Sequence, residues 1–143
     1  MIDRSDSVTI SRPVEEVFAY VVDTRNDPKW HTDAIEVQKT SEGAIRAGTT
    51  WHVHVKPSMG VSEGDIEVLT FDLNRKEVVK GSFGPMKPTV TYTFEPAGDG
   101  TRFTRHVQIK MSGGMRLMEP LIKLMFARRN AGFVGNLKQV LER

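Results

Sequence analysis

The sequence contains no cysteine, and this absence excludes several classes of protein at once. Without a thiol there is no disulfide, no thiolate nucleophile and no cysteine-ligated zinc or iron–sulfur centre. The chain also lacks a hydrophobic run near the roughly 18 residues that a membrane span requires. Its first residues, MIDRSDS, are too polar for a signal peptide. We therefore expect a cytoplasmic domain with no membrane span.

Charge of one sign is not in excess either. Twenty Lys and Arg residues stand against 18 Asp and Glu residues, so the formal net charge is only +2. One basic cluster occurs near the C-terminus, at Lys110, Arg116, Lys123, Arg128 and Arg129. A nucleic-acid-binding surface is typically broader and interleaves aromatic residues with the basic ones. We interpret the cluster as a solvated helix face and expect no nucleic-acid partner.

The motifs of common nucleotide-binding and hydrolytic enzymes are missing as well. The sequence holds no GxSxG, P-loop, GxGxxG or HExxH pattern. We therefore predict no cofactor. A function has to be inferred from the fold and from individual side chains.

Seven segments show the period-two alternation of apolar and polar residues that is typical of strands with one buried face. They are residues 5–11, 34–40, 49–56, 62–73, 77–83, 89–95 and 101–111. Turn-forming residues separate them, as at Asp99-Gly100, where the pair favours a hairpin. The 143 residues have the size of one ordinary domain and no linker divides them, so we predict a single domain over 1–143.

Two helical regions flank the strands. Pro13 stands at the first position of a predicted helix whose apolar residues, up to Val22, recur at helical spacing. Residues 24–30 predict a short second helix or a turn. The last thirty residues show an apolar stripe near period 3.6 and predict one long C-terminal helix. Pro120 marks either the start of this helix or a kink, and Gly132 weakens its interior.

The order of these elements indicates an α+β fold with a cavity. A run of antiparallel strands bounded by helices is typical of α+β proteins rather than of doubly wound sheets. A seven-stranded antiparallel sheet twists and curls. A straight amphipathic helix across its concave face cannot close the space completely, and small ligands bind in such gaps. We predict a curved sheet wrapped around the C-terminal helix, with an apolar cavity between them.

Short segments spread over nearly the whole chain also follow the pattern of a known superfamily. They are ISRPVEEVF at 10–18, DPKW at 27–30, GTTW at 48–51, VLTFD at 68–72, TYTFEP at 91–96, GDGTRFT at 98–104 and LKQVLE at 137–142. Their order resembles that of the START-like, or SRPBCC, superfamily, and most closely its polyketide cyclase/dehydrase branch. The resemblance implies a helix-grip fold with a hydrophobic cavity. It implies no single reaction, because the superfamily includes carriers, cyclases, hydroxylase domains and proteins of unknown role.

Strand and helix parity selects the side chains that we expect to face the cavity and bind a ligand. The set comprises Trp51, Val53, Leu69, Phe71, Tyr92, Phe94, Phe103, Arg105, Val107, Met118, Leu121 and Met125. Most of these are apolar. The hydroxyl of Tyr92 is a polar group that a ligand could meet.

Arg105 is the unusual member of this set. It shares parity with Phe103, so strict alternation points it inward, where a guanidinium needs a carboxylate partner or an anionic ligand. One of Glu63, Asp65 and Glu67, on another strand, could supply the carboxylate. A strand bulge that turns Arg105 outward is the other alternative. In the cavity, Arg105 would anchor a carboxylate or an enolate.

The four histidines are candidates of a second kind. His52 and His54 are two residues apart on one strand face, and two such imidazoles could form half of a metal site. Their parity is opposite to that of Trp51, so we interpret them as solvent-facing and predict no metal site. His106 falls on an exposed face. His31 lies near the expected cavity mouth, either as a general base or ligand partner or as part of a packed loop.

Three hypotheses for the function follow. The first is the binding of a small hydrophobic or aromatic ligand, lipid- or polyketide-like, oriented by Tyr92 and Arg105. The second is a polyketide cyclase/dehydratase-type enzyme that uses the same cavity, with His31, Tyr92 or Arg105 moving protons or stabilising an enolate. The third is a stress-response or interaction module with a vestigial cavity. The sequence is compatible with a monomer or a homodimer.

Overall fold

The computed structural model describes residues 1–58, 60–111, 113–130 and 132–143, and within them seven strands form one antiparallel sheet. The strands are β1 (Ile2–Ile10), β2 (Ala34–Lys39), β3 (Thr50–Ser58), β4 (Val61–Asp72), β5 (Lys76–Ser82), β6 (Lys87–Ala97) and β7 (Gly100–Lys110). Their order in the sheet is β1-β7-β6-β5-β4-β3-β2, so every neighbour except β1–β7 is also consecutive in the chain. This arrangement confirms the predicted α+β helix-grip fold.

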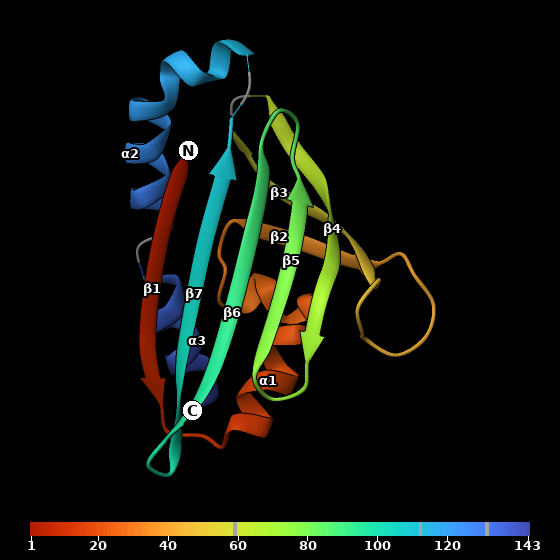
Figure 1. The fold of residues 1–143 in the computed structure, drawn as a ribbon, viewed down its shortest axis with the longest axis vertical. Coiled ribbons are helices and arrows are strands. Elements are labelled where there is room, and N and C mark those ends of the chain that lie inside the picture. Colours follow the sequence, from red (N-terminus) through yellow and green to blue (C-terminus); the bar gives the residue numbers. More distant parts are fainter. Residues whose placement is uncertain (59, 112, 131) are drawn as a thin grey trace.

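The helices lie near the two ends of the sequence, one after the first strand and two after the last strand. They are α1 (Val14–Val22), α2 (Glu119–Asn130) and α3 (Phe133–Leu141), with the 3-10 segments η1 (Thr24–Lys29) and η2 (Gly113–Met118). Figure 1 shows α1 and α3 behind the lower half of the curved sheet, whereas α2 lies beside its upper part, next to β1. None of the described helices has the length and hydrophobicity needed to cross a bilayer.

The residues at the N-terminus of helix α1 favour a helix start at this position. Pro13 precedes its first residue, and Glu15 and Glu16 place negative charge in the first turn, where it is favourable against the helix dipole. Its buried face packs on β6 and β7. The predicted short helix after it is the 3-10 segment η1, whose first turn is capped by the side chain of Asp23.

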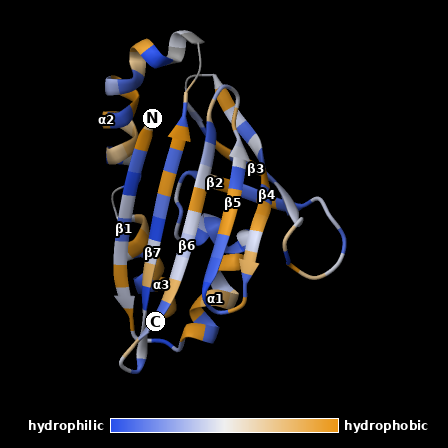
Figure 2. Cartoon of the chain, in the orientation of Figure 1, coloured by the Kyte–Doolittle hydropathy of each residue, from blue (hydrophilic) through white to orange (hydrophobic). Residues whose placement is uncertain are grey.

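An aromatic core fills the half of the concave side that lies under α1 and α3. Trp30, which directly follows η1, is fully buried with its ring close to those of Tyr92 and Phe103. Figure 2 shows the alternation of apolar and polar residues along the strands that supplies this face. The cluster comprises Ile10, Val17, Phe18, Val21, Val22, Trp30, Val68, Val79, Tyr92, Phe94, Phe103, Phe133, Leu137 and Leu141. This half of the molecule therefore holds the fold together.

The predicted C-terminal helix is divided near Gly132. The backbone of Gly132 has φ of +89°, in the left-handed region that favours glycine and that commonly follows the last turn of a helix. Pro120 is the second residue of α2, so it marks the start of a helix rather than a kink. Because of this division α3 packs on β1 and β7, while α2 takes a different direction and contacts β1.

The basic cluster lies largely on the surface, as expected of a solvated face. Its members Lys110, Arg116, Lys123 and Arg128 are exposed. The side chain of Arg129 is outside the part of the chain that the structure describes.

A bulge in β4 changes which of its residues face inward. The pairing of β4 with β5 shifts between Val68 and Thr70, so Val68 is buried whereas Leu69 is 46% exposed. Before the bulge the even-numbered residues face inward, and Glu63, Asp65 and Glu67 are therefore exposed. The prediction that one of these three carboxylates could pair with an inward Arg105 is wrong.

Candidate functional site

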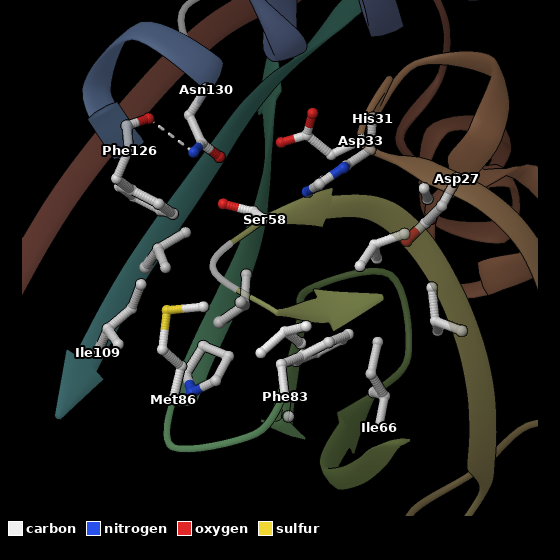
Figure 3. A pocket seen from close by; sticks show the side chains of 18 of the residues that line it. Asp27, His31, Asp33, Ser58, Ile66, Phe83, Met86, Ile109, Phe126 and Asn130 are labelled. Carbon is white, nitrogen blue, oxygen red and sulfur yellow. Dashed lines mark hydrogen bonds between the residues drawn. The ribbon is translucent and has the colours of Figure 1, made fainter. Parts of the chain in front are cut away.

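A cavity of about 210 Å³ lies in the other half of the concave side, between the sheet and α2. An apolar cavity of roughly 150 Å³ is large enough to admit benzene, so this one has room for a somewhat larger molecule. Figure 3 shows the polar side chains His31, Asp33 and Asn130 along one side and Phe83 and Met86 on the opposite side. The cavity thus has a polar end and an apolar end.

The apolar end is built by six strands, the connection between β5 and β6, and one helix. Ile122, Met125 and Phe126 reach it from α2 at the spacing of one helix face. The apolar lining residues are Ala34, Val53, Val55, Val61, Ile66, Val79, Phe83, Met86, Pro88, Val90, Val107, Ile109, Ile122, Met125 and Phe126. A ligand buried here would gain about 25 cal/mol for each Å² of apolar surface removed from water.

Phe83 owes its position in the wall to glycine on the neighbouring strands. A Cβ atom on Gly81 would lie 2.8 Å from Cε2 of the Phe83 ring and 3.0 Å from Cγ of Pro88. A Cβ atom on Gly64 would also collide with this ring. The ring therefore lies flat against β4 and β5 because neither glycine has a side chain, and this keeps the space above it open.

Arg105 lies at the polar end, where strict alternation along β7 places it. Its side chain is 4% exposed. Nη1 donates a hydrogen bond of 2.9 Å to Oδ1 of Asn130, and Nη2 lies 3.0 Å from Nε2 of His31. Its guanidinium also lies 5.6 Å above the ring centre of Phe133. The strand bulge that would have turned Arg105 outward is not found.

The contact with Arg105 determines the role of the His31 ring. A guanidinium has only donors, so Nε2 of His31 has to accept the hydrogen bond, which requires a neutral ring with its proton on Nδ1. The ring centre also lies 4.3 Å from that of Phe133. Arg105 thus occupies the lone pair through which His31 would take up a proton in this arrangement.

Two buried acids lie on this side of the sheet, Asp27 close enough to Arg105 to feel its charge and Glu77 opposite Tyr92 in the β5–β6 pairing. Burial raises the pKa of Asp27, in η1, to about 8, although the positive charge of Arg105 opposes the shift. Burial, and secondly the negative charge of Asp27, raise the pKa of Glu77 on β5 to about 8. Burial likewise raises the pKa of Tyr92. At neutral pH Asp27 is therefore mostly protonated, and it neutralises Arg105 only weakly.

The charge of Arg105 is incompletely matched by protein groups. Among the ion pairs of the described residues none joins it to a carboxylate, and its Nε has no hydrogen-bond partner. A buried cation without an ionised partner is costly. An anionic group bound in the cavity next to Arg105 would therefore be stabilised by its positive charge.

Six of the residues selected from the sequence line the cavity. They are His31, Val53, Tyr92, Arg105, Val107 and Met125. Trp51, Phe94 and Phe103 are buried but lie outside its wall. Phe71 packs at the edge of the aromatic core, 5.3 Å from the ring centre of Phe18. These four side chains face inward as expected, but in the packed half or beside η1 rather than in the hollow half.

Three selected residues lie on the surface, and their expected position in the cavity wall is wrong. The bulge in β4 turns Leu69 outward. Met118 and Leu121 are also exposed, Leu121 by 52%. The prediction continues the apolar stripe of α3 into α2, but the division at Gly132 changes the direction of the chain, and α2 presents Ile122 to the sheet instead.

Sequence reasoning missed Asp27 and Asn130, which line the cavity, and Glu77, a buried acid outside its wall. Asp27 belongs to the DPKW segment, where only its family pattern was noted. Glu77 shares strand parity with Val79, so alternation alone could have placed it inward. Asn130 follows Ile122 by eight residues, on the same helix face. For Glu77 and Asn130 the signal is a polar residue on an apolar stripe, whereas Asp27 stands among the polar residues of η1.

The outer face of the sheet carries the remaining histidines. His52 and His54 project there with Glu63 and Asp65 beside them, which confirms that they point away from the cavity. His106 also lies on this face, with Nε2 2.7 Å from Oδ1 of Asp3.

The fold is similar to that of several solved structures. A START superfamily protein from Mycobacterium smegmatis is 15% identical, with a TM-score of 0.78 over 98% of this chain and 97% of that one. TTHA0849 from Thermus thermophilus is 16% identical, with a TM-score of 0.74 over 96% and 94%. The di-domain ARO/CYC protein BexL of the BE-7585A biosynthetic pathway is 14% identical, with a TM-score of 0.78 over 99% of this chain and 47% of BexL. At these identities the likeness shows the fold alone.

No curated protein matches the sequence of this chain. A family model does match it, the one described as polyketide cyclase/dehydrase and lipid transport, over residues 1–142. The match confirms the resemblance that the sequence motifs carry. With its helix-grip sheet and its cavity between sheet and helix, the chain belongs to the polyketide cyclase/dehydrase and lipid transport family.

Proposed function

We propose that this protein binds a small, mostly apolar molecule that carries one carboxylate or enolate group. The apolar body of the ligand would lie between Phe83 and Phe126, and the anionic group would contact Arg105. The observation that carries the proposal is the buried guanidinium of Arg105, which lines a mostly apolar cavity and forms no ion pair with a carboxylate among the described residues, since the pKa of the neighbouring Asp27 is raised to about 8.

The protein's own side chains prepare Arg105 for this role. Asn130 and His31 hold its two Nη atoms, so the guanidinium has a fixed orientation before a ligand binds. A preorganised donor costs little conformational entropy on binding. Lys56, an exposed residue of the cavity lining, adds a second positive charge at the rim. The ligand would enter between Lys56 on β3 and the partly exposed Met125 on α2.

Binding of 2-naphthoate and of 2-naphthamide, measured by isothermal titration calorimetry, tests this proposal. The two probes share their apolar body and differ in charge. We expect tighter binding of naphthoate, and a loss of about 1.5–3 kcal/mol, roughly 10-fold to 150-fold, in the variant Arg105→Met. Naphthamide should bind the variant as well as the wild type.

The matched control is Arg102→Met, on the exposed face of the same strand. It removes one positive charge without touching the cavity and should leave the affinity for naphthoate unchanged. Equal affinity for both probes, insensitive to Arg105→Met, would contradict the anionic-ligand proposal. No binding of either probe or of medium-chain fatty acids to folded protein would instead favour a vestigial cavity.

A second candidate function is a cyclase- or dehydratase-type reaction in the same cavity. The observation that favours it is Asp27, a cavity-lining acid whose pKa of about 8 keeps it protonated at neutral pH. A protonated carboxyl beside a fixed guanidinium can donate a proton to a substrate whose enolate Arg105 stabilises. Turnover of a reactive poly-β-keto substrate that is lost in Asp27→Asn, with binding retained, would establish this function.

A further inference from the structure

The outer face of the sheet brings two histidines and two acids together, far from the cavity. His52 and His54 stand two residues apart on β3, and Glu63 and Asp65 stand two residues apart on β4. The antiparallel register pairs His52 with Asp65 and His54 with Glu63. Both imidazoles point outward next to the two carboxylates, and β3 and β4 are neighbours in the sheet (Figure 1). The sequence alone shows only the two histidines. The structure adds the two carboxylates that lie beside them.

The distances in this group fit a metal ion better than hydrogen bonds. Oε2 of Glu63 lies 3.8 Å from Nε2 of His52 and 3.6 Å from Nδ1 of His54, which is too long for hydrogen bonds. Ligand atoms at about 2.1 Å from a tetrahedral zinc ion are roughly 3.4 Å apart. One donor atom from each of His52, His54 and Glu63 already lies within 4.8 Å of the other two. Small rotations of exposed side chains are enough to close the remaining difference.

Asp65 completes the arrangement by orienting one imidazole. Its Oδ1 lies 2.8 Å from Nδ1 of His52, on the side of the ring away from Glu63. Metal-binding histidines commonly donate their second ring N–H to a carboxylate in this way, which fixes the tautomer and leaves the other nitrogen to the metal. The same pairing directs Nε2 of His52 toward Glu63.

We propose that His52, His54 and Glu63 bind a divalent transition-metal ion, Zn²⁺ in the first instance, with Asp65 as the group that positions His52. Two imidazoles and one carboxylate are a ligand set typical of zinc, and they leave a fourth position for water. Glu36 on β2, whose Cα is paired with that of His54, adds negative charge beside the site. A bound ion would link β3 to β4 across their hairpin.

The test is a calorimetric titration of untagged, chelator-treated protein with ZnCl₂. We expect one ion per chain, and a loss in affinity of about tenfold or more in His54→Ala and in Glu63→Gln, since each removes a direct ligand. Asp65→Asn should weaken binding less than either. The melting temperature of the wild type should rise with ZnCl₂, because a ligand of the folded state stabilises it by mass action.

His106→Ala is the matched control, because His106 also pairs with an acid on the outer face but has no second imidazole beside it. It should bind Zn²⁺ like the wild type. The absorption of bound Co²⁺ in the visible range should show tetrahedral coordination in the wild type and change in His54→Ala. Failure to bind Zn²⁺ at submillimolar concentration, or binding that His54→Ala and Glu63→Gln leave unchanged, overturns the proposal. Circular dichroism verifies that each variant is folded.

Discussion

Nη1 of Arg105 on β7 donates a hydrogen bond of 2.9 Å to Oδ1 of Asn130, the last residue of α2. Asn130 in turn donates from Nδ2 to the carbonyl oxygen of Phe126, 2.8 Å away. The amide therefore presents its oxygen to the guanidinium and its nitrogen to the helix. This pair joins α2 to the sheet at the polar end of the cavity.

Replacing Asn130 by Ala should weaken both the fold and the proposed ligand site. The change leaves a buried donor of Arg105 without its acceptor, which costs about 1–3 kcal/mol of stability. Urea denaturation measures this loss. Gln139→Ala, at an exposed position of α3, should change the free energy of unfolding by less than about 0.5 kcal/mol. An effect of Asn130→Ala no larger than that of the control would show that the pair does not stabilise the structure.

Asp27 and Glu77 should make the protein less stable as the pH rises. Burial raises the pKa of each to about 8 from the usual values near 4. Between pH 4 and 8 these two groups therefore hold protons in the folded state that the unfolded chain has lost, so their contribution to stability is greatest below pH 4 and falls until about pH 8. Asp27→Asn and Glu77→Gln should each reduce this slope and increase the stability at pH 8, on the order of 3 kcal/mol.

Chemical denaturation of the wild type and both variants between pH 4 and 9 measures this effect. Glu95→Gln, an exposed acid on β6, serves as the control and should keep the slope of the wild type. A wild-type stability that rises between pH 5 and 8 would contradict the raised pKa values.

Gly81→Ala should reduce the size of the ligand that the cavity accepts. The new methyl group would lie 2.8 Å from the Phe83 ring, so the ring has to move toward the cavity. We expect the affinity for 2-naphthoate to fall at least tenfold, and that for the smaller benzoate to change much less. Gly135→Ala, which meets no atom within 4 Å in α3, is the control. Equal losses for both ligands would indicate a general loss of structure instead.

Neighbouring residues of α2 should respond differently to truncation. Ile122 is buried against Ile2 and Ile109 in a small cluster, so Ile122→Ala should cost about 2–4 kcal/mol. Leu121 is half exposed, and Leu121→Ala should cost less than about 0.5 kcal/mol. Thermal unfolding of the two variants checks this order. A larger loss in Leu121→Ala than in Ile122→Ala would instead support the prediction from sequence that Leu121 faces the sheet.

Strands that run without interruption could be predicted side chain by side chain. In β7 the alternation holds from Thr101 to Ile109, so even the charged Arg105 lies inward as predicted. In β4 the inward residues switch parity, from Ile66 and Val68 to Phe71, and Leu69 at the point of the switch is exposed. A strand bulge produces this switch. Strict alternation extrapolated from one side of a bulge assigns the other side to the wrong face.

The buried polar residues in and beside the cavity were harder to predict for an energetic reason. Acids are rarely buried, so Asp27 and Glu77 are interpreted from sequence as surface residues unless their apolar neighbours are weighed against their charge. The contact between Asn130 and Arg105 joins positions 25 residues apart and depends on where α2 lies. That position depends on the break at Gly132, which periodicity within one helix does not reveal.

The concave side of the sheet is divided between a solid aromatic half and a hollow half. The first holds the largest buried aromatic side chains, such as Trp30 and Phe103, whereas the second is the part that the proposed ligand would contact. Substitutions at Phe83 or Met125 can therefore reshape the cavity without disturbing what keeps the chain folded. Such a separation lets one fold acquire new ligands over evolutionary time through substitutions of a few residues that line the cavity.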